Sequence, residues 1–262
     1  MLRPRIIPCL LVHNGGLVKT AQFTNPKYVG DPLNAVRIFN EKQVDELIVI
    51  DIDATVEGRE PDYGLIGRLA VECRMPLCYG GGVTRVDQVE RIIELGVEKV
   101  AVSSAAIQTP AEIERMAVAV GSQSIVVVLD VKGSGPEGYE VWTRNATFRT
   151  GRRPAEVAQA MEGAGAGEIV VNAIDRDGVM KGYDMDLINL IRGAVTLPVT
   201  ALGGAGSLDD IRRLIATFGI IGAAAGSLFV FKGAYRAVLI NYPPPAAKDE
   251  LGASVVSGRV SP

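Results

Sequence analysis

The chain repeats itself at an offset of about 120 residues. Residues 76–82, PLCYGGG, recur as PVTALGG at 198–204, and the helical segments that follow correspond position by position. Residues 48–51, IVID, likewise resemble IVVN at 169–172. Because this offset is close to half of the 262 residues, the chain is expected to fold as two similar halves. A functional feature in one half should then have a partner in the other.

Within each half, short β-branched runs alternate with segments of helical period. Strands are expected at residues 5–11, 47–52, 76–79, 99–103, 124–130, 168–172, 198–202 and 220–225. Helices are expected near residues 32–42, 63–73, 86–95, 110–120, 154–163, 185–192, 208–217 and 233–241. The strands are apolar on both faces, which is typical of buried parallel strands.

Eight strand–helix units in a chain of this length predict a (β/α)8 TIM barrel. A doubly wound open sheet shares the alternation, but the twofold repeat favours the barrel. We expect one domain over residues 1–242, with half-barrels at about 1–120 and 121–242. The segment 243–262 is rich in Pro, Ala, Ser and Gly and is expected to be a disordered tail. The long connection at 133–151 is expected to hold a small hairpin.

Charge and cysteine content exclude several classes of protein. With 27 Lys and Arg against 30 Asp and Glu, the chain lacks the basic excess of nucleic-acid-binding proteins. Its longest apolar stretch, near 220–231, is too short to span a bilayer. Three irregularly spaced cysteines indicate reduced thiols and a cytoplasmic protein. With a single histidine, His13, and no ligand spacing, no metal site is expected.

Two glycine-rich turns stand at equivalent places in the two halves, each between a strand and a helix. Backbone N–H groups in such a turn can converge on an anion. One expected anion cup contains Gly81, Gly82 and Ser104, and the other contains Gly203, Gly204 and Ser227, with Ser103 and Gly226 beside them. Tight βα turns alone would also explain one such motif, but the symmetric pair favours a substrate with two phosphates or with anionic groups at both ends.

Polar residues at expected strand ends are candidates for chemistry, because active sites of barrels lie there. Asp130 can act as a general acid or base, although a helix cap or a surface ion pair is the alternative. Its partner by the repeat is Leu11, so the first half lacks the acid. Asp51, Asn172 and Asp177 are expected to hold substrate hydroxyls or to order loops. His13 titrates near neutral pH, but a lone histidine is more often a loop residue.

A different charged set stands at the opposite, amino-terminal ends of the expected strands: Arg5, Glu46, Lys99 and Glu168. In a barrel these four side chains would ring its bottom. The pattern alone favours ordinary surface ion pairs.

Taken together, the chain resembles the cyclase subunit of imidazole glycerol phosphate synthase, an enzyme of histidine biosynthesis, from residue 5 to about residue 231. The specific pieces are GGG at 80–82, GSQ at 121–123, GAGE at 165–168, IDRDG at 174–178 and GGAG at 203–206. The resemblance implies a twofold repeated barrel, a bis-phosphate substrate at the strand carboxyl ends and no cofactor. It also implies a heterodimer with a glutaminase, which docks at the bottom and sends ammonia up the barrel. Arg5, Glu46, Lys99 and Glu168 then resemble the family's ammonia gate.

The resemblance assigns a role to Asp130 as one of the family's two catalytic aspartates, whereas Leu11 occupies the place of the other. His13 stands where the family has lysine, and Ser103 where it has asparagine. Lys19 matches and lies in a mobile first loop. The implied substrate- and phosphate-binding set is Lys19, Asp51, Gly81, Gly82, Ser103, Ser104, Asn172, Asp177, Gly178, Gly203, Gly204, Gly226 and Ser227.

Three functions follow as alternatives. The first is an ammonia-dependent lyase or cyclase of the histidine-pathway type. The second is the branch linked to surface polysaccharides, which would deliver ammonia to an acetamido nucleotide sugar and form an acetamidino group for O-antigen or lipopolysaccharide synthesis. The third is a non-catalytic scaffold that activates a glutaminase.

Overall fold

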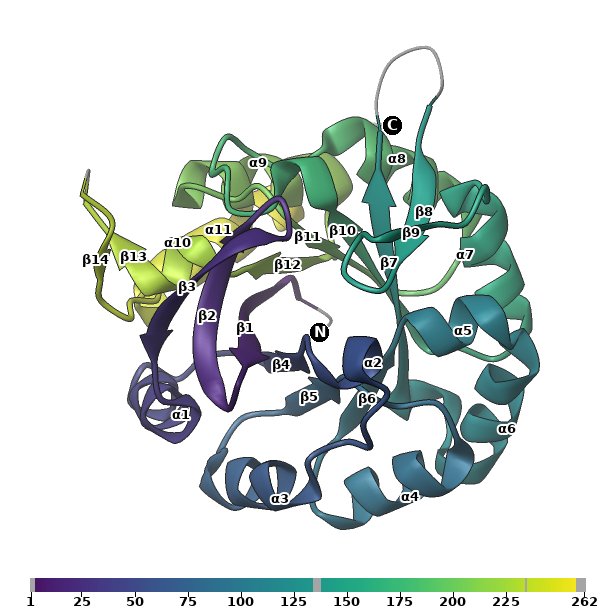
Figure 1. Ribbon diagram of the computed structural model, residues 1–262. Helices are drawn as coiled ribbons and strands as arrows, with labels where there is room; N and C mark the ends of the chain where they lie inside the picture. The colour runs from purple at the N-terminus through teal and green to yellow at the C-terminus, as the bar shows by residue number, and fades with distance from the viewer. Residues whose placement is uncertain (1–2, 134–137, 234, 258–262) are drawn as a thin grey trace.

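The computed structural model describes residues 3–133, 138–233 and 235–257. Within them, eight parallel strands close into a barrel, with β12 pairing back onto β1 (Figure 1). In order around the barrel, they are β1 (Arg5–His13), β4 (Leu47–Asp51), β5 (Leu77–Gly80), β6 (Lys99–Val102), β7 (Ile125–Lys132), β10 (Glu168–Ala173), β11 (Val199–Leu202) and β12 (Gly222–Ala225). The predicted (β/α)8 barrel is confirmed, and the closure excludes the open sheet.

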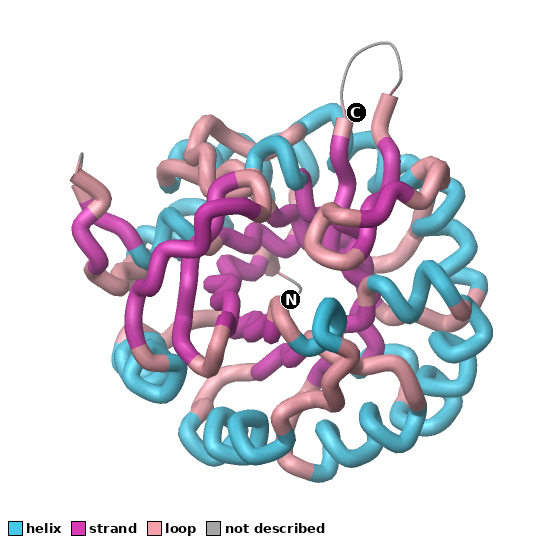
Figure 2. Tube along the Cα trace, in the orientation of Figure 1, coloured by secondary structure: helices cyan, strands magenta, loops and turns pink. Residues whose placement is uncertain are grey.

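Helices surround the barrel, as Figure 2 shows in cyan around the magenta strands. The longer ones are α1 (Pro32–Glu41), α3 (Tyr63–Glu72), α4 (Val86–Glu94), α6 (Pro110–Val120), α7 (Pro154–Gly163), α8 (Met185–Ala194), α9 (Leu208–Phe218) and α11 (Pro245–Ser257). Short helical turns are α2 (Ala54–Glu57), α5 (Ser104–Gln108), η1 (Ser122–Ser124), η2 (Ile174–Arg176) and α10 (Ser227–Val230). Four of the longer helices begin where a side chain accepts a bond from a first-turn amide, at Asp31, Asp62, Asp184 and Ser207.

The apolar core has two layers. The larger one lies between the strands and the helices and contains most of the buried aliphatic side chains. The smaller one fills the barrel itself, with Ile7, Cys9, Ile48, Cys78, Ala101, Val126, Val170 and Ala224. Because these side chains pack the interior, the barrel is a core and not an open pore. Functional groups are therefore confined to its two ends.

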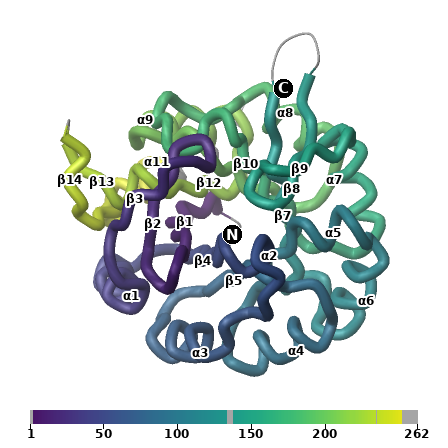
Figure 3. The backbone as a smooth tube through the Cα atoms, in the orientation of Figure 1, coloured from purple at the N-terminus to yellow at the C-terminus, as the bar shows by residue number. Residues whose placement is uncertain are grey.

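Two antiparallel hairpins rise from the carboxyl-terminal end of the barrel. One consists of β2 (Gly16–Ala21) and β3 (Thr24–Gly30) and follows β1, whereas the other consists of β8 (Glu140–Thr143) and β9 (Phe148–Arg149) and follows β7. Since β1 and β7 are the first strands of the two halves, the hairpins occupy equivalent places on opposite sides of the opening (Figures 1 and 3). The hairpin predicted within 133–151 is confirmed, although residues 134–137 lie outside the described chain.

The last part of the chain differs from the prediction. The helix expected near 233–241 is wrong, because β13 (Phe231–Lys232) pairs with β14 (Ala237–Val238) there. The disordered tail expected from residue 243 is also wrong for the described residues, because α11 packs beside α9 and Leu251 is buried. Residues 258–262 lie outside the described chain.

Polar contacts anchor this last segment to the amino-terminal side of the barrel. The Tyr242 hydroxyl donates to the Ile6 carbonyl oxygen at 2.8 Å and accepts from the Asp45 amide at 3.2 Å. Lys248 Nζ pairs with Asp45 Oδ1 at 2.8 Å. Amino-acid composition carries no information about such long-range contacts. The composition of this segment therefore predicts disorder although the segment is folded.

Removing the Tyr242 hydroxyl should destabilise the fold. Tyr242→Phe keeps the ring that packs against Phe229 but leaves two backbone groups without their partner, which should lower the free energy of unfolding by about 1–3 kcal/mol. Urea denaturation measures this change. The matched control is Tyr235→Phe, because Tyr235 is 98% exposed and should change stability by no more than about 0.5 kcal/mol. Equal stability of the two variants would contradict the anchoring role.

Candidate active site

A cavity of about 400 Å³ opens at the carboxyl ends of the barrel strands, and every barrel strand contributes to its lining. Its floor is apolar and includes Leu11, Ile50, Val128 and Leu202. Polar groups surround that floor. This is the end of the barrel at which active sites of the fold lie.

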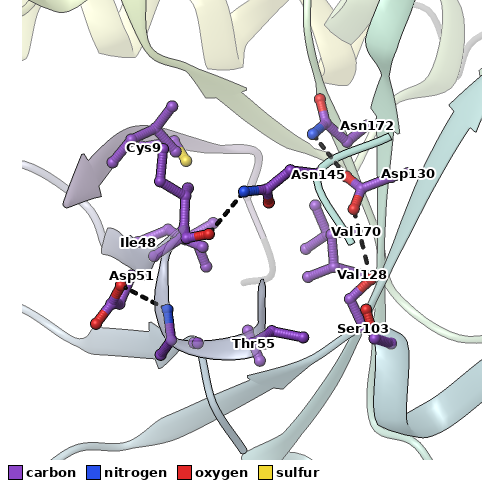
Figure 4. Close-up of a pocket in the computed structure, with 18 of the residues that line it drawn as sticks. Cys9, Ile48, Asp51, Thr55, Ser103, Val128, Asp130, Asn145, Val170 and Asn172 are labelled. Atoms are coloured by element: carbon purple, nitrogen blue, oxygen red, sulfur yellow. Dashed lines mark hydrogen bonds between the residues drawn. The ribbon is translucent and has the colours of Figure 1, made fainter. Parts of the chain in front are cut away.

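Asp130 lies at the end of β7 and projects into this cavity (Figure 4). Its Oδ1 accepts a hydrogen bond from Asn172 Nδ2 at 2.9 Å, and its Oδ2 accepts one from Ser103 Oγ at 3.4 Å. Burial raises the pKa of Asp130 to about 6, although the bonds from Asn172 and Ser103 oppose that rise. A carboxyl group that titrates near neutral pH can both take up and release a proton during a reaction.

Asn172, at the end of β10, carries a buried oxygen that the described residues leave without a hydrogen bond. It is 7% exposed, and its Oδ1 has no hydrogen bond within the described chain. A buried acceptor without a donor costs about 1–3 kcal/mol. The cavity therefore offers an acceptor that a substrate hydroxyl or amine can satisfy.

The two other acidic residues of the predicted set order loops. Asp51 Oδ1 accepts from the amides of Asp53 and Ala54, at 2.9 and 3.1 Å, and so shapes the turn after β4. Asp177 accepts from Thr20 Oγ1 at 2.7 Å and fastens the β2–β3 hairpin over the barrel. Both carboxylates line the cavity, so a loop-ordering role leaves them within reach of a ligand.

The glycine turns require glycine for backbone reasons. Gly81 and Gly204 have φ of 118° and 107°, and a Cβ at either would lie within 2.3 Å of a backbone oxygen. In the first turn, the Gly82 amide already donates to Thr55 Oγ1 at 3.2 Å. Both turns line the cavity together with Ser103, Ser104, Gly226 and Ser227, so the predicted cup residues do come together, while their occupation by an anion stays a prediction.

Lys19 lies on β2, whereas the resemblance places it in a mobile first loop. Its side chain is 5% exposed, and its Nζ donates to the Cys9 carbonyl oxygen inside the barrel mouth. A Cβ on Gly226 would lie 2.7 Å from Nζ, so the amine occupies the second expected cup. Burial lowers the pKa of Lys19. Gly178 also lines the cavity and touches the Thr20 backbone of the same hairpin.

At the opposite end of the barrel, Arg5, Glu46, Lys99 and Glu168 form a closed charge cluster. Arg5 pairs with both glutamates, and Lys99 Nζ lies 2.9 Å from Glu46 and 2.8 Å from Glu168. Burial alone would raise the pKa of Glu168, but the charges of Arg5 and Lys99 outweigh it and lower that pKa. These residues are therefore not the separate surface pairs that the pattern alone favours.

His13 does not line the cavity, although it ends β1. Its Nδ1 lies 2.7 Å from Asp53 Oδ1, and the Asn14 amide donates to Asp53 Oδ2 at 2.7 Å. The histidine thus links the first strand to the start of α2. Among the described residues no group of His, Cys, Asp and Glu is arranged to hold a metal ion. None of the described helices is both long and apolar enough to cross a bilayer.

Sequence reasoning missed the cavity residues that lie outside the barrel strands, on α2 and in the β8–β9 turn. Thr55 faces the first glycine turn, and Asn145 reaches across from the β8–β9 hairpin to donate to the Ile52 carbonyl oxygen at 2.7 Å (Figure 4). Arg144, next to it, lines the cavity as well. No periodic pattern marks these positions. The one available signal was the predicted hairpin after the strand that carries Asp130.

Comparison with known proteins agrees with this architecture. Residues 5–236 match the family described as "Histidine biosynthesis protein". The chain belongs to the histidine biosynthesis protein family.

Individual members of the histidine biosynthesis protein family cover nearly the whole chain. It is 56% identical over 252 residues to a Leptospira interrogans protein named "Putative imidazole glycerol phosphate synthase subunit HisF", with 96% of this chain and 99% of that protein covered. It is 52% identical over 243 residues to a Pseudomonas aeruginosa protein named "Putative imidazole glycerol phosphate synthase subunit hisF2", covering 93% and 97% of the two chains. Identity to the Hyphomonas neptunium "Imidazole glycerol phosphate synthase subunit HisF" is 39% over 231 residues, covering 88% and 91%.

The pKa of Asp130 provides a direct test of the site's electrostatics. Carbon-13 NMR of the aspartate carboxyl groups should show Asp130 titrating at about 6, above the usual value of about 3.9. Asn172→Ala should raise that pKa further, because it removes a donor that favours the ionised form. Asn145→Ala is the matched control, since this amide bonds to Ile52 and not to Asp130. Titration of Asp130 at its usual value, or a fall in Asn172→Ala, would contradict the described geometry.

Proposed function

We propose that the chain is the cyclase-type subunit of an imidazole glycerol phosphate synthase-like enzyme, an ammonia-dependent lyase. The observation that carries the proposal is the pair formed by Asp130 and Asn172 in the cavity. It combines a carboxyl group whose pKa is raised to about 6 with a buried, unpaired acceptor. The names of the similar proteins support the same activity.

The substrate proposed for this cavity carries two separated phosphoryl groups, or a diphosphate. The support is the symmetry of the lining, since glycine turns of both halves contribute to it. One phosphoryl group would lie at Gly81, Gly82 and Ser104, and the other at Gly203, Gly204 and Ser227. Asn172 and Asp51 lie at equivalent strand ends between the cups and would hold hydroxyl groups.

Ammonia is proposed to come from a glutaminase subunit bound at the amino-terminal face of the barrel, as a heterodimer. The support is the cluster of Arg5, Glu46, Lys99 and Glu168, which closes the barrel interior at that face. In this proposal the cluster is the gate. Opening it would require exchange of one of its salt bridges, and ammonia would then pass to the mouth.

Leu11 is the feature that favours a second candidate function. It ends the interior face of β1, opposite Asp130 on β7, and makes the floor of the cavity apolar. A general acid or base typically contributes about 10²–10⁴-fold to a rate, so its absence handicaps a reaction that needs two. That handicap favours delivery of ammonia to an acetamido nucleotide sugar, or a scaffold that only activates the glutaminase.

A turnover assay with Leu11→Asp tests the histidine-pathway reaction against the two alternatives. With ammonium salt as the nitrogen source, the native protein should turn over the substrate of imidazole glycerol phosphate synthase slowly or not at all. Leu11→Asp should raise the single-turnover rate by about 10²-fold or more, because it restores a second acid or base at the mouth. Asp130→Asn should remove the remaining turnover.

Leu11→Asn is the matched control, because it has a similar size and polarity to aspartate but does not titrate, and it should give no increase. A native rate of about 1 per second or faster would show that Leu11 is no handicap. The sugar-amidation and scaffold alternatives would then lose their support. Absence of turnover in Leu11→Asp would count against the histidine-pathway reaction.

A further inference from the structure

Four cationic side chains line the cavity, and two of them are neutralised by carboxylates. Arg59 contacts Glu57 and lies 3.8 Å from Asp51, and Arg85 lies 3.0 Å from both Glu60 and Asp87. Lys19 and Arg144 differ from this pair. Neither has a carboxylate within ion-pair distance in the part of the chain that the structure describes.

Lys19 bonds to the Cys9 carbonyl oxygen, whereas the guanidinium of Arg144 makes no hydrogen bond or ion pair with any described residue. An unpaired guanidinium beside a polar cavity is available to an anion from solution. Its planar fork matches two oxygens of a phosphoryl group.

The two unneutralised cations occupy equivalent places in the two half-barrels. Lys19 belongs to the hairpin after β1, and its Nζ lies at Gly226, beyond the end of the neighbouring strand β12. Arg144 belongs to the hairpin after β7, and its amide donates to Ser104 Oγ at 3.3 Å, beyond the end of the neighbouring strand β6. Each hairpin therefore places one basic residue at the cup that ends the preceding barrel strand, Lys19 through its Nζ and Arg144 through its backbone amide.

The β8–β9 turn holds Arg144 over the opening. Asn145 Nδ2 donates to the Ile52 carbonyl oxygen at 2.7 Å, so the turn is fastened to the far side of the first cup (Figure 4). Thr147 Oγ1 donates to the Arg144 carbonyl oxygen at 2.6 Å. Arg144, Asn145 and Ala146 all have φ between 53° and 60°, a left-handed conformation that non-glycine residues rarely adopt. Such backbone conformations cluster at ligand-binding turns.

We propose that Arg144 is a specificity-determining residue that binds one phosphoryl group of the substrate at the cup of Gly81, Gly82 and Ser104. It is the half-barrel counterpart of Lys19 at the other cup. This inference rests on the proposed function, since it assumes a substrate with two phosphoryl groups. It adds that the two ends are recognised differently, one by a compact ammonium and the other by a bidentate guanidinium.

Titration calorimetry with inorganic phosphate tests the inference. The native chain should bind two phosphates, and Arg144→Ala should lose one of them or weaken it by about tenfold or more. Lys19→Ala should affect the other site. Arg144→Lys should recover binding only in part, because an ammonium cannot make the bidentate contact. Arg149→Ala is the matched control, because Arg149 lies on the same hairpin but pairs with Glu140 and does not line the cavity.

The possible outcomes separate this inference from the proposed function. If the native chain binds no phosphate, the cups themselves fail, and the proposed function fails with them. If native and Arg144→Ala proteins both bind two phosphates with equal affinity, only the role of Arg144 is overturned. If Arg149→Ala loses as much phosphate binding as Arg144→Ala, the effect comes from the position of the hairpin. That result would also overturn the role of Arg144. The role of Arg144 is established if Arg144→Ala loses one phosphate site and Lys19→Ala retains that same site.

Discussion

The salt bridges among Arg5, Glu46, Lys99 and Glu168 close the amino-terminal end of the barrel, and the polar cavity lies at the opposite end. Removing one partner of a buried ion cluster leaves a charge uncompensated and costs about 3–5 kcal/mol. Above the cluster, apolar side chains fill the interior. Polar groups then gather at the opposite end, where both half-barrels contribute to one cavity. A charged amino-terminal end and a polar mouth are the two features that support the proposed ammonia-using enzyme.

The barrel could be predicted because its signals are local and repeated. Apolar runs and helical periods mark the strands and the helices, and the internal repeat distinguishes a closed barrel from an open sheet. The chain after Phe231 could not be predicted in the same way. Its order depends on contacts distant in sequence, such as those of Tyr242 with Ile6 and of Lys248 with Asp45. The β2–β3 hairpin was missed for a similar reason, since Asp177 fastens it from the far half of the chain.

The site was predictable where strands end and unpredictable where loops fold back. Asp130 could be placed at the mouth because it ends an apolar run, and Asn172 follows from the repeat with Asp51. Sequence reasoning also grouped the four residues of the charge cluster. The pattern alone favoured surface ion pairs, because residue spacing does not indicate how deeply these side chains are buried. Arg144 was missed because a turn fastened to Ile52 carries it. Turns of this kind have no period, so their direction is known only once the barrel has closed.

The most direct test of the central claim, that the chain is one subunit of a glutamine-dependent enzyme, is native mass spectrometry of the protein purified under mild conditions from the cells in which it is native. The account predicts a complex that contains the chain and one glutaminase subunit in equal amounts. Recovery of the chain without any amidotransferase subunit would contradict the account. The amino-terminal face, where the charge cluster lies, would then have no bound subunit that supplies ammonia.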